Sequence, residues 1–422
     1  MTRNTPKQRL YLLPVYVGSL KYYEKLLPYL RGRYDVRFLI VRPDDERRRG
    51  MLSYCEARGL SYEVLDAGLG KRGLRLPFVS AVWKRLMHQA ACRAIFEDAS
   101  NIKLVGVKAI STFEMIFREA NRRGVDTIVL QSALTPPPNF YRKDAGRDTV
   151  QLLYRAYHVL LKAIFFISDL LTQGWPYVCT SAHPKKVGVI DPGSVRIFHE
   201  RFGFDTATMT VVGNADYQRV SELREKVQND AAFRNALLKK YQLDPVKKRI
   251  LILSVWFEHH GAVRPAHLYK PAEIDRQVEH YQRVIEIVRS VCSEEAYEVL
   301  FKLHPAEKNI YESYRRYGVR YFGDEAVSEE LLCLSDLYIA DPCTSANYMV
   351  VASGIPALFD NTEALPELNK CAIFYPMTRI IQNGDELREA VRAFKEGKLD
   401  RGYDQSAIDR RSIDRIVQFI GS

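Results

Sequence analysis

The chain has 422 residues. A single domain usually contains about 150 residues, so we expect two domains of about 200 residues each. Hydrophobic residues make up 47% and charged residues 27%, which excludes a disordered, collagen-like or low-complexity protein. The net charge is +11, and the first fifty residues contribute +7 of it, with twelve Lys and Arg against five Asp and Glu. Such a basic region either attracts an anionic partner, such as a phosphorylated substrate or lipid headgroup, or is simply a solvated face.

Short apolar runs alternate with longer amphipathic ones in the first third of the chain. The predicted strands are residues 10–17, 36–41, 62–65, 104–107 and 127–130, and the predicted helices are residues 20–31, 44–58 and 112–123. Strands that alternate with helices of this length predict βαβ units and a parallel sheet. A loop with three prolines, residues 136–138, ends this first series because proline fits neither a helix interior nor a sheet interior.

A long apolar helix is predicted next, at residues 151–171. It is too short and too charged to span a bilayer, so it is either buried against the sheet, which we favour, or lies on a membrane surface. A strand at residues 187–190, a helix at 192–202 and a strand at 210–212 follow. The charged stretch 221–248 reads as a helical linker.

The alternation starts again after residue 248. The predicted strands are residues 250–255, 297–302, 337–340, 357–359 and 372–375, and the predicted helices are residues 271–292, 307–317, 385–395, 406–420 and one that begins at Ser345. The pattern predicts two doubly wound α/β domains, Rossmann-like and facing across a cleft. We place them at residues 1–218 and 219–422, with the last helix crossing back to the first domain.

Several classes of partner and cofactor are not expected. The seven cysteines are odd in number and form no Cys-x-x-Cys, so we expect neither a zinc site nor a disulfide framework. No apolar run reaches the roughly 18 residues of a membrane span, and the first residues do not resemble a secretory signal. The sequence shows no basic stripe interleaved with aromatic residues, so we do not expect the protein to bind nucleic acid. We therefore expect a cytoplasmic, soluble protein without metal or cofactor.

The carboxyl ends of parallel strands direct attention to a few loops, because ligands of such sheets bind there. The loop after strand 337–340 contains Asp341, Thr344, Ser345 and Asn347. Thr344 or Ser345 is a natural N-cap, and the N–H groups of the helix that follows can hold a phosphate. An ordinary capped helix is the competing interpretation.

Two further loops of the second half carry candidate residues. Lys302 is the last residue of strand 297–302 and His304 follows it; Pro305 forces that strand to stop, so His304 faces the same cleft. His259 and His260 follow strand 250–255 and read as phosphate or substrate contacts, with a structural role as the alternative.

The first half supplies candidates for the opposite wall of the cleft. Gln131 and Ser132 end strand 127–130, and Gly213 and Asn214 form a turn near the domain junction. The glycine patterns of a P-loop, a nicotinamide-binding fold and an α/β-hydrolase are absent from the sequence, so these three enzyme classes are poorly supported.

Taken together, these segments resemble those of GT-B nucleotide-sugar enzymes. Residues 211–217 resemble the Val-Gly-Asn-Pro turn at their domain junction, and residues 302–305 resemble the Lys-x-His-Pro loop of CDP-glycerol glycerophosphotransferases, capsule polysaccharide transferases and UDP-N-acetylglucosamine 2-epimerases. Residues 335–345 resemble their Ser-Asp-x-x-Ile-x-Asp-x-Ser-Ser stretch, and residues 354–356 resemble the x-Gly-x-Pro ahead of the next strand. The similarity runs from about residue 187 to residue 376.

The resemblance implies a GT-B glycosyltransferase that uses a nucleotide-activated sugar, without a metal, in surface-polysaccharide biosynthesis. It places the donor diphosphate on Thr344 and Ser345, with His304 as the catalytic residue, Lys302 as a further donor, and a glycan or lipid-linked acceptor on the first domain. The transferases often carry a His-Gly pair after the strand that corresponds to residues 127–130, and its histidine is taken as the base that activates the acceptor. This chain has Gln131-Ser132 there, so the resemblance identifies no acceptor base. The sequence leaves open a 2-epimerase-like epimerase or hydrolase, and a non-catalytic binding protein. We expect peripheral contact with the inner face of the membrane.

Overall fold

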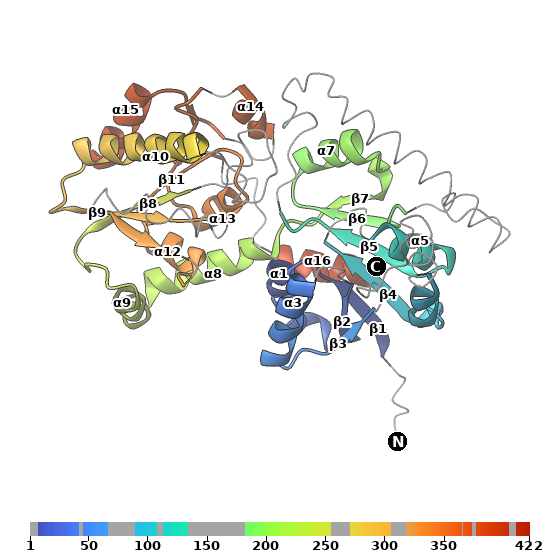
Figure 1. The fold of residues 1–422 in the computed structure, drawn as a ribbon. Coiled ribbons are helices and arrows are strands. Elements are labelled where there is room, and N and C mark those ends of the chain that lie inside the picture. Colours follow the sequence, from blue (N-terminus) through green and yellow to red (C-terminus); the bar gives the residue numbers. More distant parts are fainter. Residues whose placement is uncertain are drawn as a thin grey trace.

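The computed structural model describes eleven stretches of the chain, and Figure 1 shows their arrangement. They are residues 7–41, 45–65, 89–107, 113–133, 182–254, 271–304, 319–323, 325–364, 366–373, 377–404 and 411–422. The predicted helices 151–171 and 307–317 and the loop 136–138 lie outside them. Within the described residues, no helix is both long enough and apolar enough to cross a bilayer.

The first domain is built on a seven-stranded sheet with the order β3-β2-β1-β4-β5-β6-β7. Its elements are β1 Gln8–Leu13, α1 Val17–Glu24, α2 Leu27–Leu30, β2 Tyr34–Ile40, α3 Asp45–Ala57, β3 Tyr62–Val64, β4 Ile102–Gly106, α5 Glu114–Arg122, β5 Asp126–Leu130, β6 Lys186–Val189, α7 Pro192–Phe202 and β7 Met209–Val211. All its strand pairs are parallel. This confirms the parallel sheet predicted from the alternating pattern.

The second domain contains a six-stranded sheet with the order β10-β9-β8-β11-β12-β13, which is the strand order of a Rossmann sheet. Its elements are β8 Lys248–Leu253, α10 Pro271–Val291, β9 Tyr297–Lys302, β10 Arg320–Phe322, α12 Ser328–Leu334, β11 Leu337–Ala340, α13 Ala346–Ser353, β12 Ala357–Asp360, α14 Pro366–Asn369, β13 Ile380–Ile381 and α15 Gly384–Lys395. These strands also pair in parallel, so two doubly wound domains are confirmed.

Two connections join the domains. Helices α8 Ala215–Asn229 and α9 Ala231–Lys240 form the first, and α8 crosses from one domain to the other in Figure 1 and packs against α12 and α13. The predicted boundary at residue 218 therefore falls within α8. The second connection leads to α16 Ser412–Gly421, whose apolar residues belong to the core of the first domain. Lys103 on β4 donates to the Ile420 carbonyl at 2.8 Å and holds the end of this helix against the first sheet.

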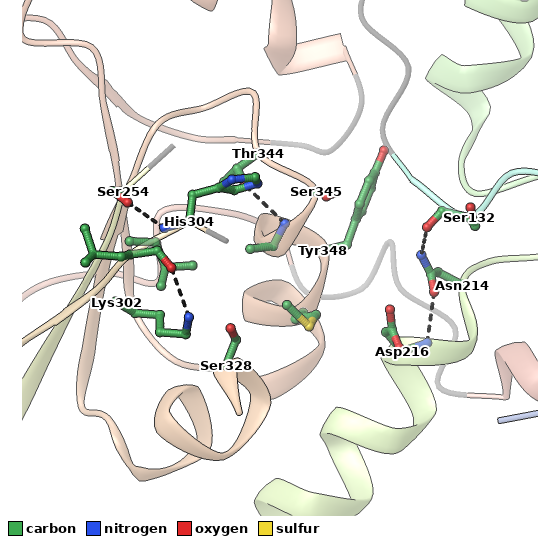
Figure 2. A pocket seen from close by; sticks show the side chains of 14 residues that line it. Ser132, Asn214, Asp216, Ser254, Lys302, His304, Ser328, Thr344, Ser345 and Tyr348 are labelled. Atoms are coloured by element: carbon green, nitrogen blue, oxygen red, sulfur yellow. Dashed lines mark hydrogen bonds between the residues drawn. The ribbon is translucent and has the colours of Figure 1, made fainter. Parts of the chain in front are cut away.

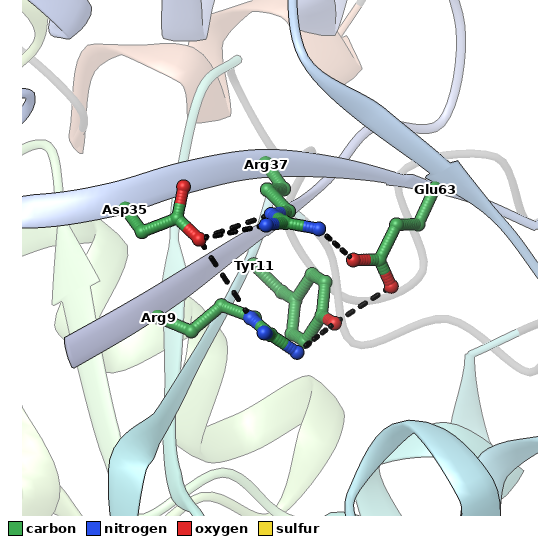
Figure 3. Close-up of polar contacts among 5 residues, drawn as sticks. All are labelled: Arg9, Tyr11, Asp35, Arg37 and Glu63. Carbon is green, nitrogen blue, oxygen red and sulfur yellow. Dashed lines mark hydrogen bonds and ion pairs between the residues drawn. The ribbon is translucent and has the colours of Figure 1, made fainter. Parts of the chain in front are cut away.

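Polar side chains from three adjacent strands form a network on one face of the first sheet (Figure 3). Tyr11 on β1 donates to Glu63 on β3 at 2.7 Å, and Arg37 on β2 contacts the other oxygen of Glu63 at 2.7 Å. Asp35 completes the network, pairing with Arg37 at 3.0 Å and with Arg9 at 3.8 Å. A one-residue slip in register would move these side chains to the opposite face, so the network helps to specify the pairing.

Several element boundaries differ from those predicted, and proline explains two of them. Strand β1 ends at Leu13, ahead of Pro14, although the β-branched residues after it extended the prediction to residue 17. The predicted helix 20–31 is divided into α1 and α2 because Pro28 lacks the N–H that would continue the first helix.

The strand predicted at residues 372–375 is wrong at residues 372 and 373, and residues 374 and 375 lie outside the described residues. Residues Lys370–Ile373 form a 3-10 helix that follows α14 directly, and it buries Cys371 in the second-domain core. The edge position next to β12 is taken by the unpredicted β13. A short apolar run is ambiguous between strand and helical turn, because either one can bury a few side chains.

Gly213 should be among the least replaceable glycines of the chain. Its φ is +80°, and an added Cβ would lie 2.5 Å from the Ser412 Oγ, at the start of the returning helix. Gly203 has a φ of +67° and nothing within 4 Å of an added Cβ. We expect Gly203→Ala to cost about 1 kcal/mol for the backbone alone and Gly213→Ala clearly more, as measured by thermal unfolding. Equal losses would show that the contact with Ser412 does not constrain the junction.

Candidate functional site

A cavity of about 180 Å³ lies between the two domains. The second domain contributes the ends of β8 and β9 and the start of α13, while Ser132 comes from the first domain and Asn214 from the junction. Strands β8 and β11 are neighbours at which the strand order of the second sheet reverses. Open α/β sheets bind ligands beside such a reversal, at the carboxyl ends of the strands. The cavity is therefore where the topology predicts a ligand.

The carboxyl end of β9 places Lys302 and His304 at this cavity (Figure 2). The His304 N–H donates to the Ser254 Oγ at 2.8 Å, which ties the end of β9 to the end of β8. Lys302 is only 4% exposed, and its ammonium donates to the Leu303 carbonyl at 2.9 Å. A buried ammonium is poorly solvated, so its charge acts strongly on an anion in the cavity.

The loop before α13 carries Thr344 and Ser345, and both line the cavity. Thr344 Oγ1 accepts from the Ala346 N–H at 3.4 Å, whereas the Ser345 side chain makes no capping hydrogen bond. Figure 2 shows the His304 ring beside this helix start. A helix N-terminus has N–H groups without intrahelical partners and the positive end of the helix dipole. The arrangement can bind a phosphate.

Asp341 and Asn347 do not line the cavity but shape this loop from behind. Asn347 is fully buried and donates to the Asp341 and Pro342 carbonyls at 2.9 and 3.0 Å. Its amide oxygen accepts from the Tyr338 hydroxyl at 3.1 Å, and the Asp341 carboxylate accepts from the Cys343 N–H at 2.6 Å. These contacts place the two side chains in the framework of the loop.

Of the site residues predicted in the first domain and at the junction, some line the cavity and others support the surrounding structure. Ser132 and Asn214 line the cavity, and Asn214 caps α8 by accepting from the Asp216 N–H at 2.9 Å. Gln131 is 3% exposed and accepts from the Ile190 N–H at 3.0 Å, so it ties β5 to β6. Gly213 provides the left-handed turn before α8. His259 and His260 lie outside the described residues.

Four polar cavity residues were missed by the sequence analysis. Ser254 follows β8 directly, Ser328 begins α12, and Asp216 lies in the first turn of α8. Tyr348 follows Ser345 by three residues, the spacing of one helix face, and that spacing could have identified it. Among the described residues, no three His, Cys, Asp or Glu side chains are grouped so as to hold a metal ion.

Polar contacts of Lys25 and Tyr348 join the domains beside the cavity. Lys25, at the end of α1, contacts the Asp216 carboxylate and lies 3.8 Å from Glu329 on α12. The Tyr348 hydroxyl donates to Asp191, which is also the N-cap of α7 and accepts from the Ser194 N–H at 2.7 Å. Burial raises the pKa of the Asp191 carboxyl group to about 6, although both hydrogen bonds favour the charged form.

Comparison with known proteins establishes the fold. No protein-family model matches the chain, and no curated protein sequence matches it. Among solved structures, it is similar to a UDP-GlcNAc 2-epimerase from Neisseria meningitidis bound to UDP-GlcNAc, with a TM-score of 0.58, 9% identity and 98% of each chain covered. It is also similar to a glycotransferase of kitacinnamycin, with a TM-score of 0.54, 12% identity, and 99% of this chain and 94% of that chain covered.

A third similar structure is the wall teichoic acid polymerase TagF, with a TM-score of 0.52, 12% identity, and 99% of this chain and 89% of that chain covered. The three neighbours, a nucleotide-sugar epimerase, a glycosyltransferase and a teichoic acid polymerase, share the GT-B arrangement of two Rossmann-like domains. This chain has the same fold over nearly its whole length, so the resemblance drawn from its motifs is confirmed at the level of the fold.

Asn347 and Ser345 should respond differently to truncation. Asn347→Ala leaves two buried carbonyls and the Tyr338 hydroxyl without their partner, so we expect a loss of about 1–3 kcal/mol in the free energy of unfolding. Ser345→Ala removes an exposed hydroxyl without a capping bond and should change stability by less than about 0.5 kcal/mol. Chemical denaturation of both variants measures the difference. A Ser345→Ala loss as large as that of Asn347→Ala would contradict the assignment.

Proposed function

We propose that this protein is a metal-independent glycosyltransferase that uses a nucleotide-activated sugar donor in surface-polysaccharide biosynthesis. One observation carries the proposal: a single interdomain cavity brings together the α13 N-terminus, Lys302 and His304. All three favour an anion, and all belong to the second domain. The similarity to a UDP-GlcNAc 2-epimerase with bound UDP-GlcNAc, to a glycotransferase and to a teichoic acid polymerase supports it.

In the proposed reaction, the donor diphosphate lies on the N–H groups at the start of α13, against Thr344 and Ser345. An acceptor hydroxyl held by the first domain attacks the anomeric carbon, the bond from that carbon to the diphosphate breaks, and the electron pair stays on the phosphate oxygen. His304 and Lys302 stabilise the negative charge that develops there, as prepositioned donors do in other enzymes. The hydroxyl proton leaves to a first-domain base. Closure of the cleft excludes water, which would otherwise compete with the acceptor.

The acceptor side of the proposal is a glycan or lipid-linked acceptor, reached at the inner face of the membrane. Ser132, Asn214 and Asp216 line the part of the cavity that an acceptor would approach from the first domain and the junction. Lys7, Arg31 and Arg33 are exposed in the basic amino-terminal region. They support electrostatic contact with anionic lipid, a contact that salt would weaken.

A nucleoside diphosphate should stabilise the protein in the presence of a chelator. UDP, CDP, GDP and CMP, and their sugars, form the test panel for thermal unfolding, with the free nucleosides as phosphate-free controls. The correct nucleotide at about 100 times its dissociation constant should contribute about 2.7 kcal/mol, which raises the melting temperature. Stabilisation that disappears with chelator and returns with manganese would overturn metal independence. Release of free sugar or of an epimer without an acceptor would identify a hydrolase or epimerase instead.

His304→Ala should reduce turnover by about 100-fold or more, because the departing phosphate loses a positioned donor. Its melting temperature should change little, since a cleft-facing ring leaves no core cavity. His199→Ala is the matched control, because His199 binds the Phe204 carbonyl at 2.8 Å on α7 and does not line the cavity. The control should keep normal turnover. A His304→Ala protein with a large loss of melting temperature and normal turnover per folded molecule would exclude the catalytic role.

A further inference from the structure

The hydrogen bond between Tyr348 and Asp191 directly links α13, the helix proposed to bind the donor phosphate, to the first domain. Tyr348 lies in the first turn of α13, three residues after Ser345, and its ring lines the cavity. Figure 2 shows the Tyr348 side chain extending away from Ser345, toward the side of the cavity where Ser132 lies. Asp191 lies two residues after the end of β6 and is the N-cap of α7, so its position is fixed by these two elements of the first domain. The bond can form only when the two domains approach each other.

Apolar packing surrounds this bond and explains why the carboxylate is poorly solvated. Ile190 and Ile197, beside Asp191 and on α7, belong to the same buried cluster as Tyr348 and Tyr217. The Tyr217 ring on α8 packs on the Tyr348 ring with centroids 5.6 Å apart. Separation of the domains would expose this packing together with Asp191.

The groups around Asp191 are mostly unable to neutralise its charge. Tyr348 from α13 donates a hydrogen bond, and Ser194 from α7 donates its backbone N–H. Tyr217 from α8 is a further titratable neighbour, and the negative charge of Asp191 contributes to raising its pKa. Asp216, next along α8, also acts on Tyr217 and contacts Lys25. Charge on Asp191 is therefore unfavourable in the closed arrangement, while a protonated carboxyl group still accepts both hydrogen bonds.

We propose that Asp191 is a positioning residue that holds α13 across the cleft through the Tyr348 hydroxyl, so that closure around the donor takes up one proton. This inference rests on the proposed function, because it assigns donor binding to the closed arrangement. Asp191 does not line the cavity, and it acts through Tyr348 rather than on the substrate.

The expected pH dependence follows from the two environments of the carboxyl group. In the closed arrangement its pKa is about 6, whereas a solvated Asp has a value of about 3.9. The closed state therefore binds the proton more tightly, and its advantage is lost as the pH rises through about 6. Donor affinity that depends on closure should be roughly tenfold higher at pH 5 than at pH 7.5, with about 0.7 proton taken up at pH 5.5.

The test is calorimetric titration with UDP-N-acetylglucosamine, and with CDP-glycerol as a second probe. A diphosphate diester is used because its phosphates do not titrate between pH 5 and 7.5, unlike the terminal phosphate of a nucleoside diphosphate. Titrations at pH 5.5 in acetate and in MES, which differ in ionisation enthalpy, give the number of protons taken up. Asp191→Asn removes the charge and the titration: its amide oxygen can accept from the Ser194 N–H, while its NH2 group can only donate to the Tyr348 hydroxyl oxygen. Its proton uptake should therefore fall by about 0.7 relative to the wild type.

Two further variants separate the linkage from general effects. Asp230→Asn changes another helix N-cap, one that accepts from the Phe233 N–H at 2.9 Å on α9, and should keep the wild-type proton uptake. Groups other than the one replaced are common to all these proteins, so the comparison removes their contribution to the proton count. Tyr348→Phe loses the interdomain bond while keeping the ring, and it should bind the probe several-fold more weakly at pH 5 than the wild type.

The outcomes distinguish this inference from the function on which it rests. Probe binding with equal proton uptake in the wild type and in Asp191→Asn would overturn the role of Asp191 and leave the donor site intact. A wild-type protein that binds neither probe, nor any nucleotide of the stabilisation panel, would overturn the proposed function. The inference, which rests on that function, would fall with it.

Discussion

The start of α13 is the constraint on which the rest of the site depends. Its first N–H groups have local acceptors: Ala346 donates to the Thr344 Oγ1, Asn347 to the Thr344 carbonyl and Tyr348 to the Ser345 carbonyl. The Ser345 side chain makes no capping bond, and the buried amide of Asn347 fixes the preceding loop. The parallel sheet then brings β8 and β9 to the same edge, where Ser254 orders the backbone of His304. Tyr348 extends this helix start to the first domain.

The sequence was sufficient for the features that depend on local pattern. Alternating strands and helices, with loops at strand ends, led to the two parallel sheets and brought Lys302, His304, Thr344 and Ser345 to one cavity. The direction of a side chain within a loop was harder to predict. Asn347 and Gln131 each lie next to a cavity-lining residue in the sequence, yet both side chains are buried in the protein interior. Successive residues point in directions about 100° apart on a helix and to opposite faces along a strand, so one position decides whether a side chain reaches the cavity.

Contacts between the domains could not be predicted at all. Asp191 has the sequence signature of an ordinary N-cap ahead of a proline, and its partner Tyr348 lies 157 positions further along the chain. Lys25 and Asp216 are separated by 191 positions. Such pairs depend on the angle between two domains, which is set by packing of α8 against α12 and α13 rather than by any pattern within one segment. The likeness to GT-B structures confirms the arrangement of domains, while sequence identities of 9–12% leave the chemistry to the residues themselves.

The return of α16 to the first domain has a mechanical consequence. The chain passes between the domains at α8 and again between Tyr403, which is buried in the second domain, and Ser412, which is buried in the first. A body attached by a single flexible segment can swivel about it, whereas two attachment points restrict relative motion to rotation about the line that joins them. Two attachment points would keep the two walls of the cavity in register if the domains separate, so that α13 and Asp191 would meet again along one path. The second domain is, in effect, an insertion within the first, and its motion relative to the first would be a hinge rotation rather than a twist.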